Sequence, residues 1–86
     1  MHGVYFIYRR AKMVIVDTTA TGTNIKAMVK EQKIKIADIQ KAMGFGTPQA
    51  IYKWFRGDTV PTIDNMVILA DMLNTTIDKI IVTAVA

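Results

Sequence analysis

The segment that most constrains this chain runs from Gly44 to Pro61 and reads GFGTPQAIYKWFRGDTVP. A glycine turn leads into a short helical pattern, which Gly57 ends. Ile51 and Trp54 lie three residues apart and share one side of the helix, which we expect to be buried. Amide, phenol and cationic groups fall largely on the other side, from Gln49, Tyr52, Lys53 and Arg56. Such a helix can lie in a groove lined with hydrogen-bonding edges and phosphates.

The length and composition describe one small domain. The chain has 86 residues, of which 51% are apolar, and this fraction is sufficient for a hydrophobic core. It has no cysteine, which excludes a disulfide framework and thiolate metal sites, and its only histidine is His2. No pair of carboxylates stands in a context that suits general acid–base catalysis. We therefore expect no enzyme activity, no metal ion, no cofactor and no small-molecule substrate.

Charge is distributed unevenly along the chain. The net charge is +3 over residues 1–12, +4 over residues 13–57 and −3 over residues 58–86, within a total of +4. One part therefore attracts a polyanion and another does not, as expected for a domain with a nucleic-acid side and a separate packing side. Small domains also show such imbalance by chance, so charge alone does not decide the function.

The first twelve residues differ from the rest of the chain. They are rich in aromatic residues and lack helix or strand punctuation, so we expect a leader over residues 1–12 and a domain over residues 13–86. The apolar run Val4 to Tyr8 is short, and basic residues follow it rather than precede it, unlike a signal peptide. No apolar run approaches the ~20 residues that span a bilayer. We expect a cytoplasmic protein without a membrane partner.

Five helical patterns follow one another between the ends of the chain. We expect a loop over residues 17–23 and a first helix that begins at Thr23 or Asn24 and ends near Lys33. The apolar spacing and capping signals predict further helices over 35–43, 48–56, 62–74 and a short stretch from residue 75. In the fourth helix the expected buried stripe is Ile63, Met66, Val67, Ala70 and Leu73.

Capping signals accompany two of these helices. Thr47 is expected to cap the third helix, with Pro48 in its first helical position, where a missing N–H has no cost. Thr75 and Asp78 have the spacing of a capping box at the start of the fifth helix.

Two runs rich in β-branched residues lie near the ends of the domain, at Met13–Val16 and Ile80–Val85. They can pair into a small ribbon, within one chain or across a dimer. The alternative is that Ile80 and Ile81 finish a helix and the residues after them fray.

Residues Ile25 to Val82 resemble the Cro/repressor-type (Xre) helix-turn-helix family, which has the lambda-repressor-like DNA-binding fold. The strongest match is Thr47 to Trp54, followed by Arg56-Gly57 and Pro61. Ile63 to Leu73 resembles the fourth helix of the family, and Thr76 to Ile81 resembles its last helix. The resemblance implies an all-α fold of five helices, to which short terminal β-strands can be added.

The chain departs from the family pattern at several positions. The turn Gly44-Phe45-Gly46 is one residue longer than usual, and Phe45 is expected to plug the core beneath it. Family members usually carry Gln at the start of the second helix, where this chain has Ile36, and often Lys or Arg in the loop after the third helix, where it has Asp58 and Thr59.

A further departure replaces one pair of residues. Many relatives have an Arg–Glu pair where this chain has Val29 and Phe55, and two packed hydrophobic residues can replace a buried ion pair without loss of stability.

The resemblance implies roles for the residues of the third helix and its surroundings. Gln49 is expected to contact the edge of a base such as adenine, Tyr52 a thymine methyl group or a phosphate, and Lys53 a guanine or a phosphate. Backbone contacts with DNA are expected around Thr47, Pro48, Arg56, Lys35 and the N–H groups at Ile36.

Each role has a plain structural alternative. Gln49 can be a solvated side chain, Tyr52 a surface aromatic that packs sideways, and Arg56 and Lys35 ordinary solvated charges. Ala50, Ile51 and Trp54 are assigned to the core. Lys26, Lys30 and Lys33 are expected to form a solvated face that adds to the positive field without specific contacts.

The function expected from these features is that of a sequence-specific transcriptional regulator that binds double-stranded DNA, as a repressor and as a homodimer. The dimer surface is expected in the run Ile80 to Val85, together with the edge of the fourth or fifth helix, and the half-sites are expected ~34–36 Å apart. The alternative is a protein-interaction module, such as an antitoxin or a phage accessory protein, and it is supported by Ile36, Asp58 and Thr59.

Overall fold

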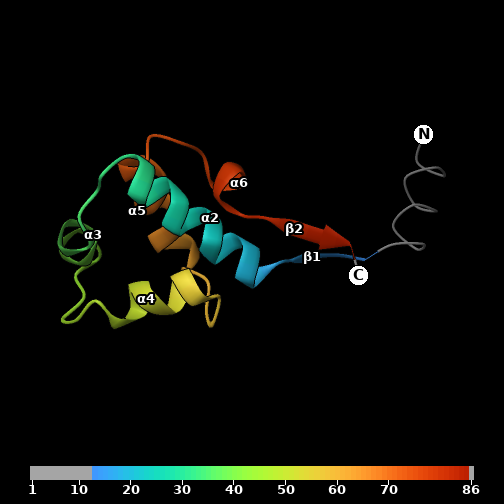
Figure 1. The fold of residues 1–86 in the computed structure, drawn as a ribbon, viewed down its shortest axis with the longest axis horizontal. Helices are drawn as coiled ribbons and strands as arrows, with labels where there is room; N and C mark the ends of the chain where they lie inside the picture. The colour runs from blue at the N-terminus through green and yellow to red at the C-terminus, as the bar shows by residue number, and fades with distance from the viewer. Residues whose placement is uncertain (1–12, 86) are drawn as a thin grey trace.

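A computed structural model of the chain describes residues 13–85, so the expected leader at 1–12 lies outside the described residues. The described part holds five helices and two short strands (Figure 1). In chain order they are β1 (Val14–Val16), α2 (Thr18–Glu31), α3 (Ile36–Met43), α4 (Gln49–Arg56), α5 (Ile63–Met72), α6 (Ile77–Ile80) and β2 (Thr83–Val85). The predicted all-α, five-helix fold with short terminal strands is confirmed.

Helix α2 begins five residues before the predicted start, so the expected loop over residues 17–23 is wrong. Asp17 is the N-cap, and its carboxylate accepts a hydrogen bond from the Ala20 N–H at 2.9 Å. The misleading residue is Gly22, which is typical of a loop. In the structure Gly22 is buried inside α2, where this helix crosses α4.

The turn between α3 and α4 follows the prediction closely. Gly44 and Gly57 end the two helices in the left-handed conformation, with φ of 73° and 79°. The start of α4 differs by one residue, because Pro48 occupies the N-cap position and its carbonyl accepts from the Ile51 N–H at 3.1 Å. Thr47 lies just outside the helix, and its hydroxyl oxygen accepts from the Gln49 N–H at 3.5 Å.

Helix α5 buries a different stripe from the expected one. The buried side chains of this segment are Met66, Leu69, Ala70 and Leu73, which follow the spacing i, i+3, i+4, i+7. Two expected members are on the surface, since Ile63 is 69% and Val67 57% exposed. Leu69 therefore takes the place of Val67, and Ile63 lies in the first turn of the helix, outside the buried stripe.

The segment after α5 turns back at Asn74, which has φ of 51°. The N-cap residue of α6 is Thr76 and not Thr75, and its side chain makes no capping hydrogen bond, so the predicted capping-box spacing is wrong by one residue. The Thr76 side chain hydrogen-bonds to Asp78, and this bond is the largest cause of a pKa of Asp78 below its ordinary value.

Strands β1 and β2 pair antiparallel within one chain, with Val14 opposite Val85 and Val16 opposite Thr83. Ile80 completes α6, as the alternative interpretation of this run proposed, and the residues after it form the ribbon rather than fray.

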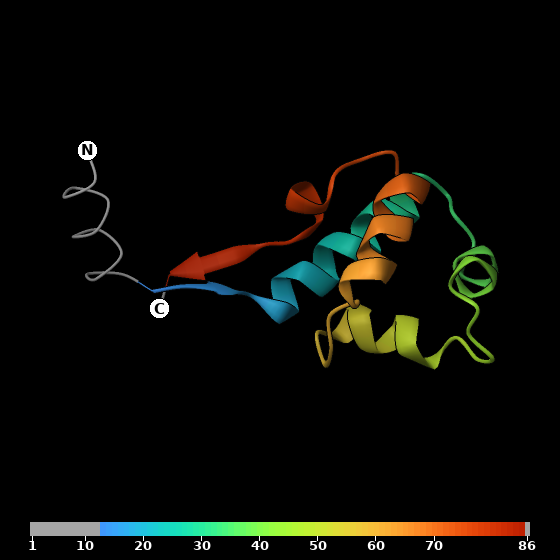
Figure 2. The same cartoon turned by 180° about the vertical axis from the view of Figure 1, so that it is seen from behind.

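The five helices surround one core. Helix α2 runs through the middle of the molecule, with α4 along one side and α6 on another (Figure 1). Figure 2 shows α5 crossing α2, and α5 contacts α3 and α6. The buried side chains that meet there are Ile25, Val29, Ile39, Ile51, Trp54, Met66, Leu69, Ala70, Leu73 and Ile80. None of the helices described in residues 13–85 combines the length and apolar character needed to cross a membrane.

Candidate nucleic-acid interface

One side of α4 presents polar and cationic groups outward, while the other is in the core. Ile51 is fully buried and Trp54 is 4% exposed, as the sequence predicts. The outward side chains follow the spacing i, i+3, i+4, i+7 and line a shallow hollow of about 300 Å³. They are Gln49, Tyr52, Lys53 and Arg56. Four of the predicted contact residues are therefore brought together on one surface.

The extended turn before α4 is held by packing from inside. The ring of Phe45 meets that of Trp54 edge-on, with centroids 5.8 Å apart and an interplanar angle of 63°. The Gln40 side-chain amide donates to the Phe45 carbonyl at 3.2 Å. Phe45 therefore packs against the core beneath the turn, as predicted, and fixes the start of α4 relative to α3.

Tyr52 lies on the exposed side of α4, but its ring packs against a neighbouring side chain of the same helix. Tyr52 is 42% exposed, and its ring meets that of Phe55 edge-on at a centroid distance of 6.2 Å. This is the sideways packing given above as the alternative for Tyr52. The residue still lines the hollow beside Gln49 and Lys53.

Arg56 has a partner that the sequence did not predict. Its guanidinium NH2 nitrogen lies 3.0 Å from Asp58 Oδ2, and its Nε donates to the same oxygen at 3.0 Å. Gly57 lies between the two residues in the left-handed conformation that ends α4, and the side chains at i and i+2 meet across it. Both side chains are more than half exposed, so the pair is worth ~0–1 kcal/mol.

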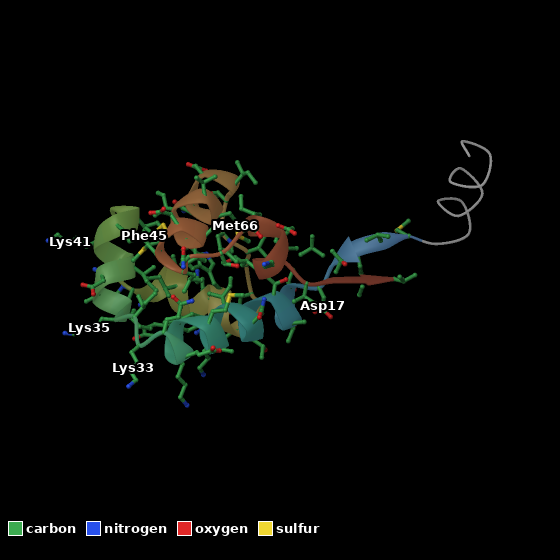
Figure 3. All side chains as sticks on the ribbon, turned by 90° about the horizontal axis from the view of Figure 1, so that it is seen from above. Asp17, Lys33, Lys35, Lys41, Phe45 and Met66 are labelled. Carbon is green, nitrogen blue, oxygen red and sulfur yellow. The ribbon has the colours of Figure 1, made fainter. Side chains whose placement is uncertain are left out.

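The remaining predicted residues lie at the start of α4 and at the start of α3. Thr47 is exposed and Pro48 half-buried at the start of α4. Lys35 is the N-cap of α3 and makes no side-chain capping hydrogen bond, while Ile36 is half-buried in the first turn. Figure 3 shows Lys35, with Lys33 and Lys41, pointing outward at the α3 end of the molecule.

A second hollow, of about 360 Å³, lies among α2, α3 and α4. Three apolar side chains line it, those of Val29, Ile36 and Phe55. Val29 and Phe55, predicted to replace an ion pair, thus line one apolar space. Two further lining residues come from α2, Lys26 and Lys30, which the sequence placed on a merely solvated face. Lys26 and Lys30 are four residues apart and flank the buried Val29 in the sequence. This spacing could have indicated that both lie beside the apolar side of α2.

Within residues 13–85 no cluster of three or more His, Cys, Asp or Glu side chains is arranged to hold a metal ion.

Comparison with known proteins gives one match. A family model described as Helix-turn-helix matches residues 25–80, which is more than half of the chain. No curated protein and no solved structure matches the chain. The matched range includes α3, α4, the turn that joins them and both hollows described above.

Proposed function

The chain belongs to the Xre/lambda-repressor-like helix-turn-helix family of DNA-binding regulators, and from this premise we propose that it reads specific duplex sequences by inserting α4 into the major groove. The observation that carries the proposal is the hollow on α4, where an amide, a phenol and two cationic side chains face outward from a helix whose other side is buried.

The chemistry of this surface suits base edges and phosphates together. The amide of Gln49 lies in the first turn of α4, where it can both donate to and accept from adenine in the major groove. Lys53, one turn later, can reach a guanine or a phosphate. Tyr52 supports the surface from the side, with its ring against Phe55.

Contacts to the DNA backbone position α4 in the groove. We assign these to Thr47 and Pro48 at the start of α4, to Arg56 at its end, and to Lys35 and the N–H of Ile36 at the start of α3. These groups lie at the ends of the two helices, where a strand that borders the groove passes.

We further propose that two copies act together and that binding represses transcription by occupying the operator. Ile80 is fully buried and cannot contact a partner, so the expected dimer surface excludes this residue. The β1–β2 ribbon remains, and Val14, Ile15 and Val16 are each 43–45% exposed. It projects from the end of the molecule opposite α3, with α4 along one flank (Figure 1). A two-fold axis through the ribbon and parallel to the direction in which α4 faces places both α4 helices on one side of the dimer.

The proposal is tested by selecting bound duplexes from a random pool with the purified protein. We expect a defined preferred sequence, and we expect Gln49→Ala and Lys53→Ala to relax it at one or two positions each. Lys79→Ala, on α6, is the control and should select the same sequence. An absence of preference among duplexes, even at low ionic strength, would overturn the proposal in favour of a protein-interaction module.

A further inference from the structure

The hollow among α2, α3 and α4 has an apolar floor and a cationic rim. Val29, Ile36 and Phe55 form the floor, and the exposed Lys26 and Lys30 lie on the α2 side. The two lysines are four residues apart, so they occupy neighbouring positions on one face of α2, where like charges repel. An anion bound between them would relieve that repulsion.

This hollow adjoins the surface of α4 that is proposed to read DNA. Tyr52 lines the first hollow and Phe55 lines the second, and the rings of these two residues meet at 6.2 Å. Ile36, in the first turn of α3, lines the second hollow as well. A DNA strand that borders the groove occupied by α4 and passes the start of α3 therefore crosses the second hollow.

We propose that Lys26 and Lys30 bind two phosphates of that strand, with the apolar carbons of the intervening deoxyribose over the floor formed by Val29, Ile36 and Phe55. The inference rests on the proposed function, and it adds α2 as a third element that contacts DNA. It also assigns a use to residues that the sequence placed on a solvated face.

Two features of the structure support this assignment. Ile36 lines the second hollow but has no polar group with which to contact a phosphate, so a side-chain contact to the strand that crosses this hollow has to come from another lining residue. Lys26 and Lys30 are uncommitted, since the one ion pair formed within residues 13–85 joins Arg56 and Asp58. Their ammonium groups are therefore available, whereas Arg56 has to exchange a carboxylate for a phosphate.

The experiment compares the salt dependence of binding to the selected duplex. The variants are Lys26→Gln, Lys30→Gln and the double variant, with Lys79→Gln on α6 as the control that removes the same charge elsewhere. Each phosphate contact contributes about 0.9 to the slope of log K against log salt. We expect each single variant to lower that slope by about 0.9, the double variant by about 1.8, and Lys79→Gln to leave it nearly unchanged. The preferred sequence should not change.

A second arm locates the contact on the DNA. Duplexes that carry one neutral methylphosphonate are scanned along the strand that borders the groove. Among the positions at which a methylphosphonate weakens binding by the wild-type protein, two should have no further effect on binding by the double variant.

The possible outcomes separate the inference from the proposed function. If the wild-type protein does not bind duplex DNA, the proposed function fails and the inference fails with it. If the wild-type protein binds and the double variant, folded by circular dichroism, keeps the wild-type slope, the inference alone is overturned. A fall in slope as large for Lys79→Gln as for the double variant would also overturn it, because the effect would then be one of net charge.

Discussion

Gly22 of α2 lies directly against the backbone carbonyl of Trp54 in α4. A Cβ atom on residue 22 would overlap that oxygen and would lie 2.9 Å from the Phe55 carbonyl oxygen and 3.0 Å from the Gly57 nitrogen. All three atoms belong to backbone, which cannot move aside as a side-chain tip can. The absence of a side chain at this position therefore sets the distance between α2 and the helix proposed to read DNA.

Gly22→Ala is expected to destabilise the protein. In an unobstructed helix, alanine is favoured over glycine by ~1 kcal/mol. Here the clash with the α4 backbone outweighs that gain, and overpacking of this kind costs about 1–3 kcal/mol. The free energy of unfolding in urea measures the change. Gly46→Ala is the matched control, because a Cβ there meets nothing within 4 Å, and an equal loss in both variants would contradict the close crossing.

Thr21→Val is expected to loosen the base of the ribbon. The buried Thr21 hydroxyl accepts from the Val82 N–H at 2.9 Å and donates to the Val82 carbonyl at 3.3 Å. Valine keeps the shape but leaves the Val82 N–H unsatisfied, at a cost of about 1–3 kcal/mol. Amide hydrogen exchange at Val82 and the melting temperature report the effect.

Thr23→Val provides the comparison for this variant. In the wild-type protein the Thr23 hydroxyl donates an exposed hydrogen bond to the Thr19 carbonyl, one turn earlier in the same helix. We expect little change in stability and none in exchange at Val82. Faster exchange at Val82 in this variant as well would argue against a specific role of Thr21.

The structural features that the sequence predicted are local ones. Gly44 and Gly57 end helices because a left-handed residue there is a short-range requirement, and the inward side of α4 follows from spacing alone. The features that it missed depend on distant partners. A glycine at position 22 suggests a loop, and its role in the helix crossing is evident only once α4 is placed beside it. The hydrogen bond between Thr21 and Val82 joins residues 61 positions apart.

The same distinction applies to the candidate site. The outward residues of α4 share one short helix, so their common surface was predictable. Lys26 and Lys30 come to line the second hollow only because α2 packs beside α3 and α4. Spacing within one helix does not reveal this packing.

Phe55→Glu is expected to destabilise the fold, since it places a carboxylate in the apolar hollow that Val29 also lines. Lys26 and Lys30 at the rim offset part of the desolvation cost, so we expect a loss of roughly 1–3 kcal/mol rather than the larger penalty of an isolated buried charge. Thermal unfolding measures it. Phe55→Leu keeps the apolar character and should lose less, and an unchanged melting temperature in Phe55→Glu would refute the proposed packing of Val29 with Phe55.

Asp58→Asn is expected to strengthen DNA binding. The substitution removes a negative charge close to the DNA strand that Arg56 is proposed to contact. It also removes the ion-pair partner of the Arg56 guanidinium. One additional phosphate contact raises the magnitude of the salt slope by about 0.9. Fluorescence anisotropy with a labelled duplex at several salt concentrations measures both affinity and slope. The variant Asp71→Asn, on α5, removes an equal charge elsewhere, and a similar gain in affinity there would rule out a specific effect of Asp58.

Removal of residues 83–86 is expected to convert a dimer into a monomer. The deletion removes β2 but keeps Val82, so the hydrogen bonds to Thr21 remain. A two-stranded ribbon is marginal on its own, and β1 and β2 carry no charge or proline to discourage edge pairing with a second copy. Light scattering measures the mass. Val85→Lys, which places a charge on the ribbon and leaves its length intact, should also favour the monomer, and deletion of residues 1–12 should leave the dimer in place. If the mass is that of a dimer after both ribbon changes, the two copies pair through another surface.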